Sequence, residues 1–214
     1  SFTGSTRAGA LISQNAAKDF KRISLELGGK GANIIFKDAD SEAVARGVLR
    51  CFRNSGQSCN APTRMLVPQN RYKEALEIAM EANKNIVTGD PNLDTTDLGP
   101  LVSKIQFNKV QRLIKSGIDE GAKLISGGLG KPEGLEVGYY VKPTIFAEVT
   151  NDMEIAREEI FGPVLSVISY SSAKEAVEIA NDTEYGLAAY VTGSDVDELM
   201  NYARQLNAGQ IHLN

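Results

Sequence analysis

Short runs of β-branched and other apolar residues alternate along this chain with segments in which apolar residues recur at helical spacing. The strand-like runs span residues 33–36, 63–68, 122–126, 164–170, 187–193 and "QIHL" near the end, with a further extended stretch at 139–149. Strands that alternate with helices form right-handed βαβ units, and such units build a mostly parallel sheet. We therefore expect an α/β fold with helices on both faces of a mostly parallel sheet.

Four sets of apolar residues each fall on one side of a predicted helix. Ser172 with Glu175, and Ser194 with Asp197, have capping-box spacing, so we expect two more helices to begin there, the second ending at Gly209. The four apolar sets are Leu11, Ile12, Ala16 and Phe20; Val44, Val48, Cys51 and Phe52; Tyr72, Leu76, Ala79, Met80 and Ile86; and Phe107, Val110, Ile114 and Ile118.

Length and composition argue against several classes of protein. A chain of 214 residues buries roughly 70% of its unfolded surface, which suffices for a core without disulfides. The net charge of −4 gives no support for nucleic-acid or membrane binding, and no apolar run approaches the roughly 18 residues that span a bilayer. With only two cysteines and no signal-peptide layout, a reducing cytoplasm is the expected location. Both chain ends read as the middle of strands, so we expect a piece of a longer protein.

One thiol lies in the unusual polar loop "FRNSGQSCNAPTR", residues 52–64, between a helical pattern and a strand. A structural cysteine prefers the core, and Cys51 fits that description on its apolar helix face. Cys59 instead lies among small polar residues. Only roughly 3% of an unperturbed thiol is ionised at neutral pH, so a nucleophilic role for Cys59 requires nearby N–H groups or charges.

A glycine-rich turn, "GSTRAG" from Gly4 to Gly9, follows the end of a strand and opens a helix. Its backbone N–H groups and the helix dipole would attract a phosphate. The same turn also occurs in many α/β proteins that bind no ligand there, so by itself it leaves both interpretations open.

Two carboxylate motifs complete the set. In "LELGGK", Glu26 lies between two leucines, and an apolar setting would raise its pKa toward the range of a general base. The alternative is a strand glutamate facing solvent. In "EEIFGPV", Glu159 and Phe161 would point the same way if extended; the alternative is a charged loop edge beside a core phenylalanine.

His212, the only histidine, allows a rival Cys59–His212 thiol hydrolase. Metal binding is poorly supported, because the cysteines and the histidine are too widely spaced.

Together the motifs resemble the NAD(P)-dependent aldehyde dehydrogenases. The family patterns F-T-G-S-T-x-x-G, L-E-L-G-G-K, F-x-N-x-G-Q-x-C and E-E-x-F-G-P-V match residues 2–9, 25–30, 52–59 and 158–164. The stretches "LGPLVS", "KPTIF" and "NDTEYGLAAYV" are also similar, so the resemblance covers essentially the whole chain. It implies an aldehyde dehydrogenase catalytic-domain-like fold.

The resemblance also implies roles for individual residues. Cys59 would attack the aldehyde to give a thiohemiacetal and then a thioester, with its own N–H as one oxyanion donor. Glu26 would activate the hydrolytic water, which favours the hydrolytic over the CoA-acylating type. The implied cofactor is NAD or NADP, with NAD as the default. Glu159 would bind the nicotinamide ribose, Phe161 would lie beside the nicotinamide, and Gly4 and Ser5 would lie near the pyrophosphate. Leu27 is also implied to bind the cofactor.

Family members are considerably longer than this chain. The resemblance implies that residues 1–27 are the C-terminal tail of the dinucleotide-binding domain and residues 28–214 the catalytic domain. It also implies a small-molecule aldehyde as substrate and a homodimer or homotetramer for the full-length protein. We expect the 214-residue piece to be inactive alone. The alternatives are a folded catalytic-domain piece with only a binding or structural role, and the Cys–His hydrolase.

Overall fold

A computed structural model describes residues 1–214 and contains a seven-stranded sheet in the order β5-β6-β7-β4-β3-β8-β9. Only β5 and β6 are antiparallel; every other neighbouring pair is parallel. The mostly parallel α/β fold is therefore confirmed. The strands are β1 Phe2–Thr3, β2 Leu25–Glu26, β3 Ala32–Ile35, β4 Arg64–Pro68, β5 Lys123–Ser126, β6 Thr144–Ala147, β7 Val164–Tyr170, β8 Ala188–Thr192 and β9 Gln210–Leu213.

Seven α-helices connect and cover the strands, and side-chain caps explain where several of them begin. The Asp40 and Ser172 side chains accept from the N–H groups of Ala43 and Glu175, as N-cap residues do. The helices are α1 Thr6–Ala17, α2 Ser41–Phe52, α3 Tyr72–Lys84, α4 Lys104–Asp119, α5 Glu154–Arg157, α6 Ala173–Asn181 and α7 Val196–Ala203, with 3₁₀ turns at Arg53–Gly56 and Gln69–Arg71. None of them combines the length and apolar character that a bilayer-spanning helix needs.

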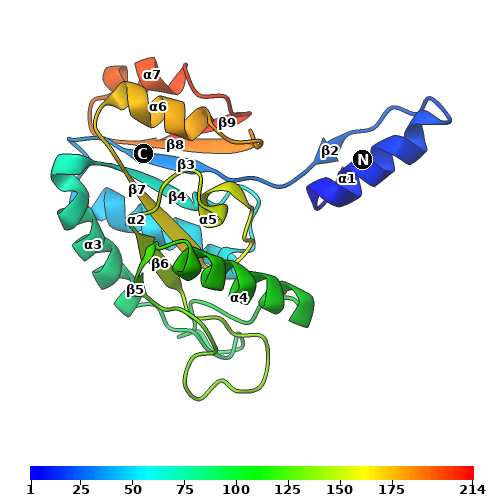
Figure 1. The fold of residues 1–214 in the computed structure, drawn as a ribbon, viewed down its shortest axis with the longest axis horizontal. Coiled ribbons are helices and arrows are strands. Elements are labelled where there is room, and N and C mark those ends of the chain that lie inside the picture. Colours follow the sequence, from blue (N-terminus) through cyan, green and yellow to red (C-terminus); the bar gives the residue numbers. More distant parts are fainter.

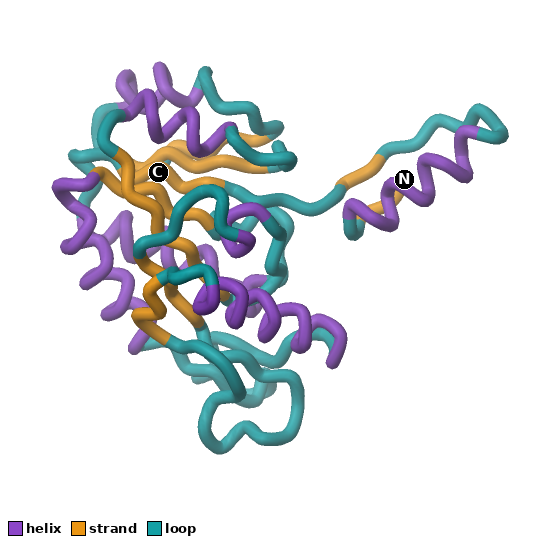
Figure 2. The backbone as a smooth tube through the Cα atoms, viewed as in Figure 1, coloured by secondary structure: helices purple, strands orange, loops and turns teal.

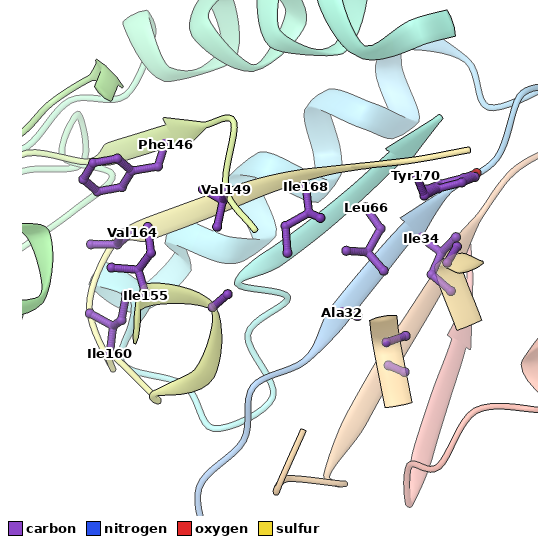
Figure 3. Close-up of a cluster of buried hydrophobic side chains, with 14 of the residues drawn as sticks. Ala32, Ile34, Leu66, Phe146, Val149, Ile155, Ile160, Val164, Ile168 and Tyr170 are labelled. Carbon is purple, nitrogen blue, oxygen red and sulfur yellow. The ribbon is translucent and has the colours of Figure 1, made fainter. Parts of the chain in front are cut away.

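The sheet is buried on both faces. Successive side chains of a strand point to opposite sides, so each buried strand contributes apolar residues to two clusters. On β3, Ile34 belongs to one apolar cluster and Ile35 to the other. The cluster around Ile34, drawn in Figure 3, packs against α4, α5, α6 and α7. The cluster around Ile35 packs against α2 and α3. Helices therefore cover both faces, as the alternating pattern predicted.

Three helix predictions are wrong in detail. Helix α3 ends at Lys84, so Ile86 lies beyond it. Helix α1 ends at Ala17, so Phe20 does not join its apolar face; Phe20 has φ 53° and is 95% exposed. Helix α7 takes Asp195 as its N-cap and ends at Ala203, well before Gly209. The N–H and hydroxyl of Ser194 instead donate to Asp38, at 2.8 and 2.6 Å, so a tertiary contact replaces the predicted cap.

The N-terminal segment stands apart from the main body. Helix α1 and the short parallel pair β1-β2 project away from the seven-stranded sheet (Figure 1). A single extended stretch after β2 joins this segment to the body (Figure 2). The projecting segment ends near residue 27, where we predict the boundary between the tail of the cofactor domain and the catalytic domain. This domain boundary stays a prediction.

Arg64 anchors that connecting stretch to the body. Its guanidinium is buried and donates twice to the Lys30 carbonyl, at 3.1 and 3.0 Å, and once each to the carbonyls of Ile179 and Ala180 at 2.9 Å. A fifth bond reaches the Asn151 side chain. The last two carbonyls belong to the end of α6, where helix carbonyls lack internal partners. Burial lowers the pKa of Arg64 to about 10, the nearby Arg157 adding to the effect.

Replacing Arg64 with methionine is expected to lower the free energy of unfolding by more than about 4 kcal/mol, because each carbonyl left buried without a donor costs about 1–3 kcal/mol. Urea denaturation followed by circular dichroism measures it. The control is Arg46→Met, which removes only the exposed ion pair with Glu42 and should cost at most about 1 kcal/mol. Equal losses in the two variants would contradict the structural role of Arg64.

Candidate active site

The loop that carries Cys59 has an unusual backbone. Directly after α2, the three residues Asn54, Ser55 and Gly56 have positive φ values of 55°, 54° and 69°. Non-glycine residues rarely adopt this region, and such strain persists only where the surroundings hold it. Here the Ser55 hydroxyl donates to the Gly99 carbonyl at 2.8 Å, and the Gln57 side chain accepts from the Val102 N–H at 2.9 Å. The loop is therefore fixed rather than free.

Close backbone packing brings three of the sequence motifs together at this loop. A Cβ atom on Gly29 would lie 2.2 Å from the Cys59 carbonyl oxygen, and one on Gly56 would lie 2.1 Å from the Gly162 carbonyl oxygen. Both contacts are with backbone atoms, so no side chain fits at either glycine. Gly29 of "LELGGK" and Gly56 of the loop itself are thus required for the loop to pack against the "LELGGK" and "EEIFGPV" segments.

Glu159 is held at the same place. Its side chain accepts from the Gly29 N–H at 3.0 Å, and its own carbonyl accepts from Lys109 at 2.6 Å. Phe161 has a φ of 55° and is not extended, so the condition under which its side chain would point the same way as Glu159 is not met. Gln106 on α4 donates to the Phe161 carbonyl at 2.8 Å and so helps to hold this strained conformation.

Most of the predicted site residues line one cleft with a volume of about 560 Å³, within the usual size range of small-molecule sites. The cleft therefore brings together the loop that carries Cys59, the glycine-rich turn and the "EEIFGPV" segment. Its predicted residues are Gly4, Ser5, Leu27, Cys59, Glu159 and Phe161, and its other lining residues are Thr3, Gly28, Gln57, Ser58, Asn60, Gln106 and Lys109.

Glu26 is the exception, and its expected apolar environment is wrong. The residue is exposed on the two-residue strand β2, which pairs only with β1 through Thr3, and it does not line the cleft. The reason is local: no layer of the described chain covers this side of β2. Leu27, the next residue, does turn inward, and its side chain occupies the space beside Gly9 of α1.

The two cysteines differ as predicted in their exposure. Cys51 is buried, and burial raises the pKa of its thiol to about 12, with Lys30 acting in the opposite direction. Cys59 is partly exposed. No hydrogen bond joins Cys59 to His212; that imidazole stacks on Tyr190 with ring centres 4.7 Å apart. The geometry therefore gives no support to a Cys–His hydrolase.

Sequence reasoning missed two residues that line the cleft, Gln106 and Lys109, and a buried lysine outside it, Lys30. Gln106 and Lys109 reach it from α4, about fifty positions away from the segment they bind, and no local pattern marks them. Lys30 directly follows the two glycines of "LELGGK", and its place in that motif is the one sequence feature that points to it. Its ammonium group is buried without a hydrogen-bond partner, and burial, followed by the nearby Arg64, lowers its pKa to about 7.

A mostly parallel α/β sheet that sets a fixed loop thiol beside a glycine-rich turn defines a class of enzyme-like domain with a thiol at a cleft of small-molecule size. The chain belongs to the aldehyde dehydrogenase family, whose model matches residues 1–214. It is 55% identical over 215 positions to a 3-succinoylsemialdehyde-pyridine dehydrogenase of Pseudomonas sp.. That match covers 100% of this chain and 45% of the relative, so the chain spans less than half the length of this relative.

Solved structures give the same result. A cysteine-to-alanine mutant of aldehyde dehydrogenase C from Pseudomonas syringae, in complex with NAD⁺ and octanal, is 54% identical with a TM-score of 0.98. An aldehyde dehydrogenase of Mycobacterium tuberculosis in complex with NAD⁺ is 41% identical with a TM-score of 0.97. Each match covers 99% of this chain and 44% of the other.

Proposed function

We propose that the full-length protein carrying these residues oxidises an aldehyde to a carboxylic acid with NAD(P), with Cys59 as the nucleophile. The observation that supports this most directly is the single cleft that joins Cys59, Glu159, Phe161 and the Gly4–Ser5 turn. The thiolate of Cys59 adds to the aldehyde carbon, giving a thiohemiacetal whose oxygen the Cys59 N–H stabilises. Loss of hydride leaves a thioester, which water then hydrolyses.

The residues present fit a nicotinamide dinucleotide. Glu159 is half-buried, faces the cleft and accepts only one N–H bond, so its carboxylate can accept from ribose hydroxyls. Phe161 presents an aromatic ring to the same cleft, and Ser5 caps the N-terminus of α1, where a phosphate is favoured. When bound, the nicotinamide supplies the hydride acceptor. We favour NAD because two solved relatives hold NAD⁺.

The remaining assignments are proposals of the same kind. Leu27 lines the cleft beside the cofactor, and the substrate is a small-molecule aldehyde, as octanal is in the Pseudomonas syringae complex. Two free thiols fit a reducing cytoplasm. We also propose that the full-length protein forms a homodimer or homotetramer and that the 214-residue piece alone is inactive.

Glu26→Gln in the full-length enzyme is expected to slow hydrolysis of the thioester by about 10²- to 10⁴-fold, the usual value of a general base. Acyl-enzyme formation should change less, so stopped-flow mixing should show a burst of NADH followed by a slow steady state. Glu158→Gln is the matched control, because Glu158 is exposed and lies outside the cleft. Steady-state turnover unchanged by Glu26→Gln would remove this residue from the reaction.

A further inference from the structure

Lys30 carries a buried amino group that the proposed reaction does not use. Its side chain is 2% exposed, and its Nζ has no hydrogen-bond partner within residues 1–214. A charge buried without a partner is costly, so most lysines stay exposed or are paired when buried. The groups around Lys30 indicate which one its charge acts on.

The backbone beside Lys30 is held between two fixed groups. Directly before it, the Gly29 N–H donates to the Glu159 carboxylate at 3.0 Å, and a Cβ on Gly28 would lie 2.5 Å from a carboxylate oxygen of Glu159. The Lys30 carbonyl itself accepts twice from the buried Arg64 guanidinium, at 3.1 and 3.0 Å. Glu159 therefore packs against the two residues that precede Lys30, and the backbone of Lys30 is fixed beside it.

A small cavity lies next to the same residues. Its volume is about 20 Å³, enough for one water molecule, and both Lys30 and Tyr185 line it. Burial raises the pKa of the Tyr185 phenol, and the N–H of Glu159 opposes that shift, so the phenol oxygen lies close to the Glu159 backbone. Lys30 and Tyr185 thus share one cavity beside the segment that carries Glu159.

The charges that act on Lys30 come from four different parts of the fold. Burial lowers the pKa of Lys30 to about 7, and Arg64 on β4 and Lys109 on α4 add to this effect. Cys51 on α2 and Glu159 act in the opposite direction. Because burial raises the pKa of Cys51 to about 12, its thiol is neutral near pH 7. Glu159 is the only carboxylate among these groups, so its charge is the one that can balance the buried ammonium group.

We propose that Lys30 is a positioning residue for Glu159: its protonated ammonium group holds the carboxylate against the Gly29 N–H, in the orientation that binds the cofactor ribose, and loss of this proton weakens NAD binding. The inference deepens the proposed function and rests on its assignment of Glu159 to the cofactor. Lys30 does not line the cleft, so it acts through Glu159 and not on the ligand. Because the pKa of Lys30 is about 7, affinity for NAD should be highest below that pH and should fall above it.

Calorimetric NAD⁺ titration of the full-length protein between about pH 6 and about pH 8.5 tests this. A Cys59→Ala background prevents ionisation of the reactive thiol from contributing. We expect the Kd to rise about fivefold or more across this range, and the further change Lys30→Met to give, at every pH, the weak binding that the parent shows at the highest pH. A Kd that is independent of pH in the parent, or equally pH-dependent in the Lys30→Met variant, would overturn the proposal.

Two controls accompany that titration. Methionine is similar in length to lysine and buries no charge, so Lys30→Met is expected to fold, and a thermal melt followed by circular dichroism checks it. Lys115→Met changes an exposed lysine on α4 that pairs with Asp119 and lies outside the cleft. This variant should reproduce the affinity and the pH dependence of the parent.

The ionisation of Lys30 gives a second readout that needs neither cofactor nor turnover. Nuclear magnetic resonance of the full-length protein labelled with [ε-¹³C]lysine follows the lysine side chains, and the signal that is missing in Lys30→Met identifies Lys30. We expect this signal to titrate near pH 7 and Glu159→Gln to lower its pKa, because the carboxylate favours the charged amine. Glu158→Gln, at the exposed neighbouring position, should leave the titration unchanged.

The two readouts separate this inference from the proposed function. A Lys30 titration that Glu159→Gln does not move, in an enzyme that oxidises aldehydes with NAD⁺, would refute the positioning role alone. Absence of NAD⁺ binding at every pH would refute the proposed function, and the role of Lys30 in cofactor binding with it.

Discussion

Alanine in place of Cys59 is expected to lower aldehyde oxidation by the full-length enzyme by at least about 10⁴-fold, as loss of a covalent nucleophile does in other enzymes. The strained 53–56 turn and its two glycine contacts hold this thiol at the cleft. Without it no thiohemiacetal forms, and the neighbouring Ser58 hydroxyl is a far weaker nucleophile at neutral pH. Initial rates of NADH formation at saturating NAD⁺ and aldehyde measure the loss.

Cys51→Ala is the matched control for that experiment. It removes a buried thiol from the core beneath α2 and should cost about 1–2 kcal/mol of stability while leaving the rate nearly unchanged. Brief treatment of the native enzyme with iodoacetamide gives a second readout, with alkylation expected at Cys59 and not at Cys51. Retained activity in Cys59→Ala, or alkylation confined to Cys51, would show that the nucleophile has been misassigned.

Much of this cleft could be predicted from the sequence because its parts are short local motifs. The position of Cys59 between a helix and a strand, and the glycines at 28, 29 and 162, are all legible in contiguous residues. Each glycine has a physical cause in the structure: a Cβ on Gly29 would lie 2.2 Å from the Cys59 carbonyl oxygen, and one on Gly28 or Gly162 would lie 2.5 Å from the side chain of Glu159 or Val110. The alternation of Ile34 and Ile35 between two cores follows in the same way from strand geometry.

The remaining features depend on contacts that no local pattern encodes. The exposure of Glu26 depends on which layers cover the two-residue strand β2, and its leucine neighbours could not show that. Glu159 and Phe161 would point the same way only in an extended segment, but Phe161 has positive φ, with its carbonyl accepting from Gln106 on α4. Ser194 lost its predicted cap to Asp38, which is 156 positions away. For Phe161 and Ser194 a long-range contact outweighed a local preference, whereas for Glu26 no layer of the described chain supplies the contact that its neighbours suggested.

A polypeptide of residues 1–214 alone is expected to fold and to oxidise aldehydes more than about 10⁶-fold more slowly than the full-length enzyme. Folding rests on the seven-stranded sheet, whose two clusters of 26 and 14 buried residues are complete within the chain. The cofactor side is different. The turn at Gly4 and Ser5 is supported only by β1 and β2, two residues each, and a two-stranded unit is marginally stable at best.

The expected loss of oxidation rate follows from how firmly the cofactor is held beside the thiol. Holding the reacting groups in near-attack geometry accounts for about 7–11 kcal/mol of a barrier, and that requires a firmly bound cofactor. In this chain the cofactor would contact only the cleft around Glu159, Phe161 and the projecting turn. The resemblance to the aldehyde dehydrogenases also implies a second oxyanion donor, an asparagine side chain that residues 1–214 do not supply, and one such donor is worth about 2.7–4 kcal/mol. Calorimetric NAD⁺ titration and NADH formation, on material shown to be folded by circular dichroism, test this directly. Micromolar NAD⁺ binding with turnover near that of the full-length enzyme would mean that the seven-stranded unit and its short N-terminal arm hold the cofactor unaided.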